Sequence, residues 1–267
     1  MALSLLILLG TGSSAGQVQQ REAALRYSAS QLDCARFRET SESAIRTETG
    51  GRVQDQSSGR GAVWRFRANA AVDGLSLEGW LDSLSLWRKS REGTMRPDTD
   101  GLLGGRYRGT LSESGTYSGR VRPFIPDEIA EVAGMAAALD DFFPPLAPGP
   151  LRPGESWSDS SGVVLRRMAD SALSGVPLYR FELELRRRAT TSRLPADTTL
   201  IRLHQVSRER GSFVWHPVLG LLRRDRRILV ETSVPAGRSI RRPVRSRIEQ
   251  RITVIRDLSS SPVPGGC

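Results

Sequence analysis

The sequence predicts a mainly β protein of about ten long antiparallel strands with one central α-helix. Three observations predict it. Apolar and polar residues alternate with a period of two over long stretches, Gly- and Pro-containing turns separate these stretches, and one segment carries helical spacing. Short turns imply antiparallel order, because parallel neighbours need long crossover connections. We expect a strongly curved sheet or partial barrel, with a two-sheet sandwich as the alternative.

The amino terminus, residues 1–15, carries the features of a cleaved export signal. An apolar run from Leu3 to Leu9 is followed by small residues ending at Ala15, which is the pattern that signal peptidase reads. The run is much shorter than the ~20 apolar residues that cross a bilayer. A buried amino-terminal strand is the alternative, because no Lys or Arg precedes the run. We expect an exported protein, periplasmic or secreted, with no transmembrane segment in its mature chain.

The alternation is clearest between residues 240 and 254. Even positions there are mostly apolar, and a strand can present two such different faces whereas a helix cannot. The odd positions are mostly charged and include Arg241, Arg245, Arg247 and Arg251. The same alternation marks strands around residues 64–70, 179–186 and 227–234. Asp73-Gly74 is the best candidate for a hairpin turn.

Residues 126–143 are expected to form a helix of about four turns. Pro126 suits a first helical position and two acidic residues follow it. Apolar residues then recur at helical spacing, and Pro144-Pro145 ends the segment. The acidic pair Asp140-Asp141 at the helix end opposes the helix dipole. We expect these carboxylates to meet arginines of the sheet, with a role in a binding site as the alternative.

The strands fall into two halves of one β-rich domain, residues 16–258. The helix and the Pro-rich link join these halves, and a polar tail that we expect to be disordered follows. The parts are residues 24–125, helix 126–143, link 144–154, residues 155–258 and tail 259–267.

Short motifs in the link carry a resemblance to a known group. Phe142-Phe143-Pro144-Pro145-Leu146 precedes Pro150-Leu151-x-x-Gly154-x-x-Trp157. This segment resembles the central link of exported β-rich bacterial proteins of unknown function, and Thr99–Gly105 is similar to a turn in the same proteins. The overall plan is also similar to that of periplasmic lipoprotein carriers, whose curved sheet holds an apolar groove. The resemblance implies a strand-rich exported protein and brings no known site.

The chain is basic, with a formal net charge of +10, yet we expect no nucleic-acid partner. Only Lys89 of the 39 basic residues is lysine, a skew typical of a GC-rich genome, and the arginines are spread over every strand. A solvated strand face explains them, although a basic surface also attracts acidic partners.

The two cysteines, Cys34 and Cys267, allow one pairing in an oxidising compartment. A disulfide between them and two free thiols both remain open.

No residues converge on a catalytic, metal or cofactor site. Gly12-Ser13-Ser14-Ala15-Gly16 matches a nucleophile motif but lies in the export signal. The two histidines, His204 and His216, have no metal ligand at the spacing of a known site. We therefore expect a protein that is not an enzyme and has no cofactor; an unidentified hydrolase is the alternative.

Aromatic and apolar residues on the inward strand faces either fill the core or line a cavity. The second interpretation predicts an envelope protein that binds an apolar or amphipathic ligand, such as a lipid, in the concavity of the sheet. The candidate lining residues are Trp64, Phe66, Trp157, Tyr179, Phe181 and Leu183. The alternative function is a structural or interaction module that binds an acidic envelope component through Arg241, Arg245, Arg247 and Arg251.

Overall fold

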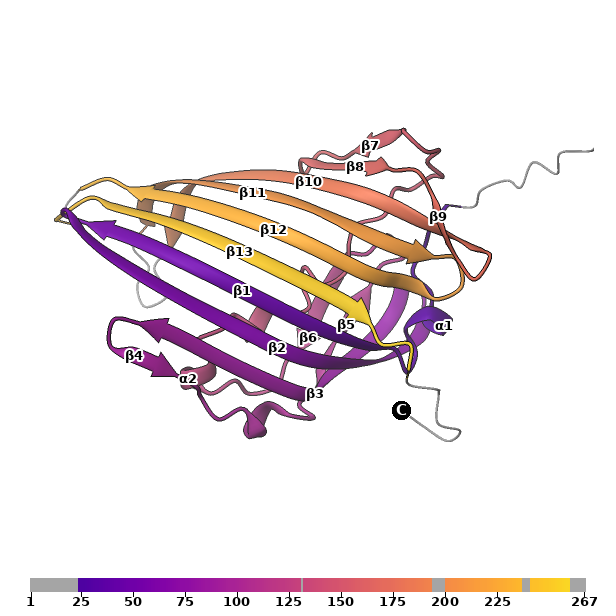
Figure 1. Ribbon diagram of the computed structural model, residues 1–267, viewed down its shortest axis with the longest axis horizontal. Coiled ribbons are helices and arrows are strands. Elements are labelled where there is room, and N and C mark those ends of the chain that lie inside the picture. Colours follow the sequence, from indigo (N-terminus) through magenta and orange to yellow (C-terminus); the bar gives the residue numbers. More distant parts are fainter. Residues whose placement is uncertain (1–23, 131, 194–199, 237–240, 260–267) are drawn as a thin grey trace, which may run out of the picture.

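The computed structural model describes residues 24–130, 132–193, 200–236 and 241–259. Over these residues the chain forms one curved, unclosed antiparallel sheet of thirteen strands (Figure 1). The mainly β prediction is confirmed, and the single sheet excludes the sandwich alternative. The expected signal at residues 1–15 lies outside the described residues, as does the tail beyond Ser259.

The strands are β1 (Arg36–Thr49), β2 (Arg52–Ala71), β3 (Gly74–Ser90), β4 (Gly93–Met95), β5 (Tyr107–Leu111), β6 (Tyr117–Val121), β7 (Ser156–Ser158), β8 (Val163–Arg167), β9 (Ser171–Leu173), β10 (Val176–Arg193), β11 (Leu200–His216), β12 (Gly220–Val234) and β13 (Val244–Arg256). The helical pieces are α1 (Ala29–Leu32), η1 (Asp100–Leu102), α2 (Asp127–Ala130) and η2 (Met135–Ala137).

Two meanders meet in the middle of the sheet. Its order is β6-β5-β3-β2-β1-β13-β12-β11-β10-β8-β7, with β4 added to β3 and β9 added to β10. The first long strand therefore pairs with the last one, in a register from Phe37 opposite Arg256 to Thr49 opposite Val244. This pairing joins the two strand-rich halves in one sheet.

Glycines with positive φ form the turns that connect β1, β2 and β3. Asp73 leads into Gly74, which opens β3 with φ of 122°, and Gly50 and Gly51 between β1 and β2 have φ of 57° and 81°. Residues other than glycine rarely adopt these backbone φ angles. The predicted hairpin at Asp73-Gly74 is confirmed.

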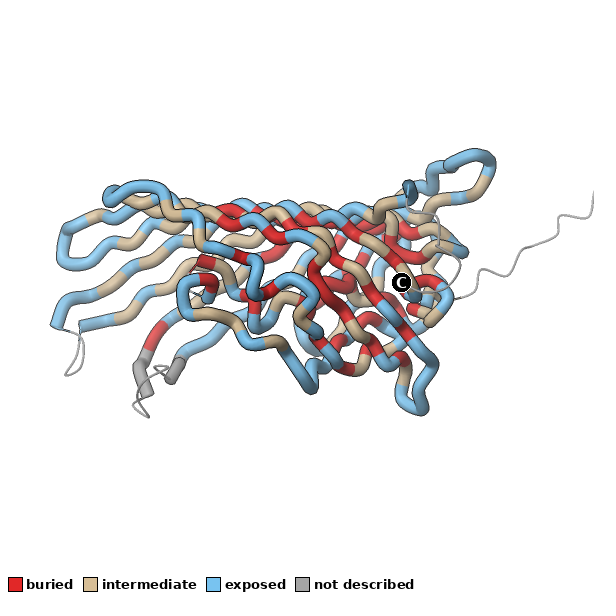
Figure 2. The backbone as a smooth tube through the Cα atoms, turned by 90° about the horizontal axis from the view of Figure 1, so that it is seen from below, coloured by how far each residue is buried: buried red, intermediate tan, exposed pale blue. Residues whose placement is uncertain are grey.

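The alternation of the sequence separates the two faces of the sheet. Residues that are directly opposite on neighbouring strands point to the same face. The face that carries the buried Phe37, Val254 and Phe213 is concave, so the sheet forms an open trough. Figure 2 shows the buried residues gathered in one half of this trough. The other half, which ends at the β1–β2 turn, is mostly exposed or half-buried.

A plug, defined as residues 134–147, fills the buried half of the trough. Phe142 packs against Phe37, Trp64 and Phe66, with ring centroids 5.7, 6.1 and 5.3 Å apart. The Tyr27 hydroxyl, from the segment before α1, donates a hydrogen bond to the carbonyl of Pro144 over 3.0 Å. The plug and this segment together form the core with the inward faces of the strands.

The prediction of one four-turn helix over residues 126–143 is wrong. Over its described residues the segment contains only α2 and η2, which are separate short pieces. Gly134 stands between them with ψ of 58°, outside the helical range. Burial still follows helical spacing in part, because Ile129, Val132 and Leu139 are buried, but Met135 is buried where a regular helix would bury Ala136. Contacts with the trough, rather than helix propensity, set the conformation of the segment.

Candidate functional site: the open half of the trough

The open half of the trough has a concave surface without charge along its four central strands. We call this surface the trough floor. It rests on β1, β11, β12 and β13, with β2 beside them, and most of its residues are half-buried. The floor residues are Ser43, Ile45, Thr47, Gln54, Gln56, Ser58, Leu203, Gln205, Ser207, Ile228, Val230, Thr232, Val234, Val244, Ser246, Ile248 and Gln250.

Charged residues surround the trough floor on the concave face and cover the convex face behind it. Inward arginines occur at its rim, at Arg52, Arg88 and Arg187. The outward positions between floor residues carry most of the charges, such as Glu42, Arg46, Arg247 and Glu249. The chain has a net charge of +10, yet the trough floor is uncharged. The charged residues lie mainly on the opposite, convex face of the sheet.

The apolar centre of the floor is a row of directly paired residues. Ile45 of β1 is opposite Ile248 of β13, and Ile248 is opposite Val230 of β12. Gln56 of β2 continues the row on one side and Ser207 of β11 on the other. The row is therefore an apolar strip flanked by hydrogen-bonding groups, which suits an amphipathic ligand.

Buried ion pairs close the inner end of the floor. Arg226 of β12 donates two hydrogen bonds of 2.7 Å to Glu209 of β11, and Arg224 lies 3.4 Å from the same carboxylate. The two arginines also hold the plug, because Arg224 donates to the carbonyl of Phe142 over 2.9 Å and Arg226 to that of Asp141 over 3.0 Å. This cluster fixes where the core ends and the open trough begins.

The cluster stays charged. Burial alone would raise the pKa of Glu209, but the hydrogen bond and charge of Arg226 and the charge of Arg224 outweigh it and hold that pKa below its usual value. Burial and the neighbouring Arg226 lower the pKa of Arg224 to about 10, so its guanidinium remains protonated at neutral pH. Across the trough, Arg60 pairs with Glu39, which also accepts a 2.8 Å hydrogen bond from the Trp64 indole.

A cavity of about 310 Å³ lies beneath the plug and opens onto the floor. It shares Ile228 and Gln250 with the floor, and the small residues Gly134, Ala137 and Ala138 of the plug form its roof. The trough floor therefore continues into a cavity under the plug.

The predicted lining residues lie in the filled half of the trough. Trp64 and Phe66 face the concave side but are completely buried under the plug. Phe181 stacks on Phe213 with ring centroids 4.8 Å apart, and Leu183 is buried beside it in the same face. Contact of these four residues with a ligand stays a prediction that requires the plug to move.

The other two candidates lie nearer the edge of the sheet. Trp157 of β7 is half-buried against the core. Tyr179 of β10 borders a cavity of only about 20 Å³ beside residues 146–151, and the Arg167 guanidinium lies 4.5 Å from its ring centroid. This space is too small for a ligand in the structure.

The predicted basic residues occupy the convex side. Arg245, Arg247 and Arg251 are exposed outward residues of β13, and Arg241 is exposed in the turn before it. Arg247 forms ion pairs with Glu249 at 2.7 Å and with Glu231 at 3.9 Å.

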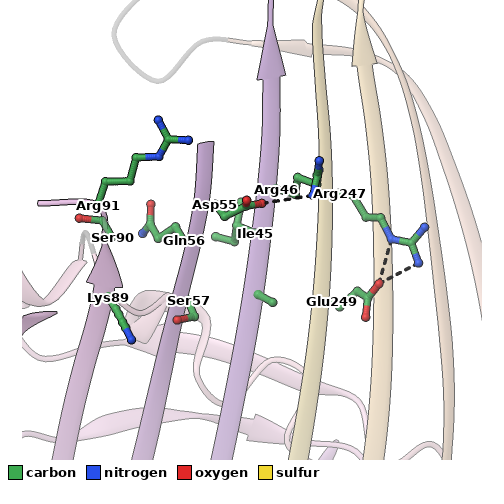
Figure 3. Close-up of a pocket in the computed structure, with 11 residues that line it drawn as sticks. Ile45, Arg46, Asp55, Gln56, Ser57, Lys89, Ser90, Arg91, Arg247 and Glu249 are labelled. Carbon is green, nitrogen blue, oxygen red and sulfur yellow. Dashed lines mark hydrogen bonds and ion pairs between the residues drawn. The ribbon is translucent and has the colours of Figure 1, made fainter. Parts of the chain in front are cut away.

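A hollow of about 510 Å³ lies at the tip of this convex face (Figure 3). Its charges are largely paired, with Arg46 3.8 Å from Asp55 and Arg247 bound to Glu249. Exposed pairs of this kind contribute ~0–1 kcal/mol. The hollow is therefore a solvated charged surface.

The remaining predicted residues have structural contacts. Cys34, in the turn before β1, is disulfide-bonded, while Cys267 lies outside the described residues, so their pairing stays a prediction. The Nδ1 atom of His216 accepts hydrogen bonds from the backbone N–H groups of Val218 and Leu219, at 3.1 and 3.0 Å, and so stabilises the turn between β11 and β12. His204 is exposed.

Neither a group of three metal-ligating side chains nor a helix long and apolar enough to cross a bilayer occurs in the part of the chain that the structure describes.

No protein-family model and no curated protein sequence matches the chain. Solved structures that are similar to it at low identity include the following three. Lipovitellin, in a structure of its lipid–protein interactions, has a TM-score of 0.49 and 10% identity over 89% of this chain and 26% of its own. A DUF1329 family protein from Desulfovibrio piger has a TM-score of 0.18 and 11% identity over 86% of this chain and 90% of that one.

The third similar structure is a protein from Bacteroides fragilis described as exported, with a YmcC-like fold. It has a TM-score of 0.20 and 12% identity over 84% of this chain and 97% of its own. This chain spans about a quarter of the lipovitellin chain. Because all three TM-scores are below 0.5, these likenesses carry no inference about ligand or location.

Proposed function

We propose that this protein is an exported, non-enzymatic binding protein that holds an apolar or amphipathic ligand, such as a lipid, along the trough floor. One observation carries the proposal: along the trough floor the inward residues of four adjacent strands are uncharged, while the outward residues between them are mostly charged. In a sheet with water on both faces, arginine and glutamate would occur on both faces. Their restriction to one face along the floor indicates that the other face contacts something other than water. Export rests on the amino-terminal sequence alone.

The chemistry of the floor fits a ligand with both apolar and polar parts. Each methylene removed from water contributes ~0.8 kcal/mol, so an acyl chain over Ile45, Ile248 and Val230 gains affinity from burial alone. Ser, Thr and Gln side chains beside this strip donate and accept hydrogen bonds without adding charge. The cavity of about 310 Å³ under the plug is a place for one end of the ligand.

Extraction of the exported protein, purified without detergent, tests the proposal. Organic extraction and mass spectrometry should find acyl lipids or other amphipathic molecules at a fixed ratio to protein. The variant Ile45→Glu/Ile248→Glu, purified in parallel, should retain at least tenfold less, because it places two carboxylates in the apolar strip. Equal amounts in both samples, or no bound molecule in the wild-type protein, would contradict the proposal.

A second function, binding of an acidic protein partner, is favoured by one feature of the convex face. Arg210, Arg227 and Arg251 are directly opposite one another on β11, β12 and β13. Like charges in such positions are destabilising, and Glu184 pairs only with Arg210, at 3.1 Å, over the described residues. An acidic partner over Arg227 and Arg251 would relieve the repulsion.

Retention on immobilised poly-L-glutamate at increasing salt tests this second function. Arg227→Gln/Arg251→Gln should elute at clearly lower salt than Arg180→Gln/Arg186→Gln, which removes the same charge from outward positions of β10. If the two variants elute together, net charge alone explains the retention.

A further inference from the structure

Two buried tyrosines beside the plug have hydroxyl groups without a partner. Tyr107 opens β5 and Tyr117 opens β6, and their side chains are 3% and 9% exposed. Neither hydroxyl oxygen has a hydrogen-bond partner among the described residues. Buried hydroxyls are normally hydrogen-bonded, so two orphaned ones at one place call for a ligand or another explanation.

Both tyrosines line a cavity of about 390 Å³ between β6 and the plug. Asp140 and Leu139 of the plug form one wall, and the stretch from Gly119 to Arg122 forms another. This cavity lies across η2 from the one that opens onto the trough floor, since Ala136 lines the first and Ala137 the second. We call it the tyrosine site.

Two glycines on neighbouring strands fix the position of the Tyr117 ring. Gly109 and Gly119 are direct partners on β5 and β6, and the ring lies across both of them. A Cβ atom at Gly109 would stand 2.8 Å from the ring, and one at Gly119 would stand 3.3 Å from it. Tyr107 is held edge-on against Trp64, with ring centroids 5.4 Å apart. Packing therefore fixes both rings, and because the two hydroxyl oxygens are covered in the free protein, side chains at the cavity wall must shift for a ligand to reach them.

The hydroxyls act as donors at neutral pH. Burial raises the pKa of Tyr107 to about 12, although the charge of Arg60 opposes this, and burial and the charge of Asp140 raise the pKa of Tyr117 to about 12. Arg120 and Arg122, both exposed, add two guanidinium groups at the cavity wall. Neither of them forms an ion pair with another described residue.

We propose that the tyrosine site binds a zwitterionic phosphate ester, either a free monoester or the phosphodiester headgroup of a lipid. The phosphate oxygens accept hydrogen bonds from Tyr107 and Tyr117 and face Arg120 and Arg122, while the ammonium group of the ligand meets the carboxylate of Asp140. Phosphate is an acceptor of several hydrogen bonds and a strong partner of arginine. The carboxylate selects a ligand with a positive group over a bare polyanion, and the volume leaves room for the organic part.

Isothermal titration of the full chain with phosphoethanolamine tests the site. Saturable binding is expected, with inorganic phosphate binding more weakly because it lacks the ammonium group. Dihexanoyl phosphatidylethanolamine below its micelle concentration distinguishes the sources: tighter binding of this lipid identifies a lipid headgroup, and equal or weaker binding identifies a free ester. No saturable binding of either zwitterion at millimolar concentration would overturn the proposal, whatever the trough floor binds.

The variant Tyr107→Phe/Tyr117→Phe separates ligand binding from a structural role. It removes only two unpartnered hydroxyls, so the melting temperature of the free protein should stay equal or rise while phosphoethanolamine affinity falls at least tenfold. Tyr27→Phe, whose hydroxyl has a partner in Pro144, should instead melt lower and bind normally. A lower melting temperature for the double variant, or unchanged affinity, would overturn the proposal.

Exposed residues supply a second comparison that does not depend on the core. Arg120→Gln/Arg122→Gln should bind phosphoethanolamine several-fold more weakly. Arg180→Gln/Arg186→Gln, on the convex face, should bind it as the wild type does. Equal losses in both variants would show that net charge, and not the tyrosine site, attracts the ligand.

Discussion

At the scale of single residues, we expect the buried carboxylate of Glu209 to make a large contribution to the free energy of unfolding. Its carboxylate is almost completely buried between Arg224 and Arg226. Removal of one partner from a buried ion pair costs ~3–5 kcal/mol, because the remaining charge is left uncompensated. We expect Glu209→Gln to lower the free energy of unfolding by about that amount in denaturant titrations.

The matched control is Glu231→Gln, at an outward position of β12. Glu231 is 43% exposed and pairs with Arg208 at 3.5 Å and Arg247 at 3.9 Å. Exposed pairs contribute ~0–1 kcal/mol, so this variant should unfold almost as the wild type does. Equal losses for the two variants would contradict the role assigned to burial.

The same carboxylate makes stability depend on pH. The pKa of Glu209 is lowered in the folded protein, so its contribution is complete above the ordinary glutamate pKa of ~4.3 and is lost as pH falls through the folded value. Unfolding free energies measured from pH 7 to pH 3 should therefore fall in acid more steeply for the wild type than for Glu209→Gln. Parallel curves would show that Glu209 is not coupled to folding.

Single residues also show what the sequence could and could not indicate. Arg224 and Arg226 share the phase of the inward Ile228 and Val230, so the alternation itself places these two charged residues on the concave face, which is otherwise mostly apolar. That signal was available and was missed. The unpartnered hydroxyls of Tyr107 and Tyr117 had no such signal, because tertiary packing against Trp64 and the Gly109–Gly119 pair places the two rings.

At the scale of elements, alternation predicted the strands well and helical spacing predicted the plug poorly. Strand periodicity survives because the sheet sorts each residue to one of two faces. The 126–143 segment instead follows the surface of the trough, and its apolar residues are buried without continuous helix. The expected contact of Asp141 with a sheet arginine does occur, with Arg226 at 3.8 Å.

Close packing of the plug on the sheet gives an element-scale prediction. A Cβ atom at Gly79 of β3 would stand 2.8 Å from the Phe66 ring and 3.1 Å from Leu139 of the plug. Overpacking of a tight core costs ~1–3 kcal/mol, so Gly79→Ala should lower the free energy of unfolding by that amount.

Gly101→Ala is the comparison, because a Cβ atom there meets nothing within 4 Å and its φ is not positive. We expect a change of ~1 kcal/mol or less, of either sign. A Gly79→Ala variant that unfolds like Gly101→Ala in the same titration would mean that the plug does not press on β3.

At the scale of the whole molecule, the sequence predicted a curved β-sheet but not its order. The pairing of β1 with β13 brings together residues about two hundred positions apart, and no local pattern specifies such a contact. The trough floor depends on it, because Ile45 and Ile248 come from these two strands. Trp64 and Phe66 lie on the concave face under the plug, and local sequence patterns do not specify which part of that face residues 134–147 cover.

The central claim is that the trough floor, and not the outer face, binds an apolar or amphipathic ligand. Ile248 and Ile255 belong to the same strand and lie on opposite faces, Ile248 half-buried on the floor and Ile255 43% exposed on the outside. The decisive measurement is a titration of the ligand-free protein with a fluorescent fatty acid. Ile248→Glu should weaken binding at least tenfold and Ile255→Glu should leave it unchanged. Equal affinities in both variants, or a greater loss in Ile255→Glu, would contradict the claim.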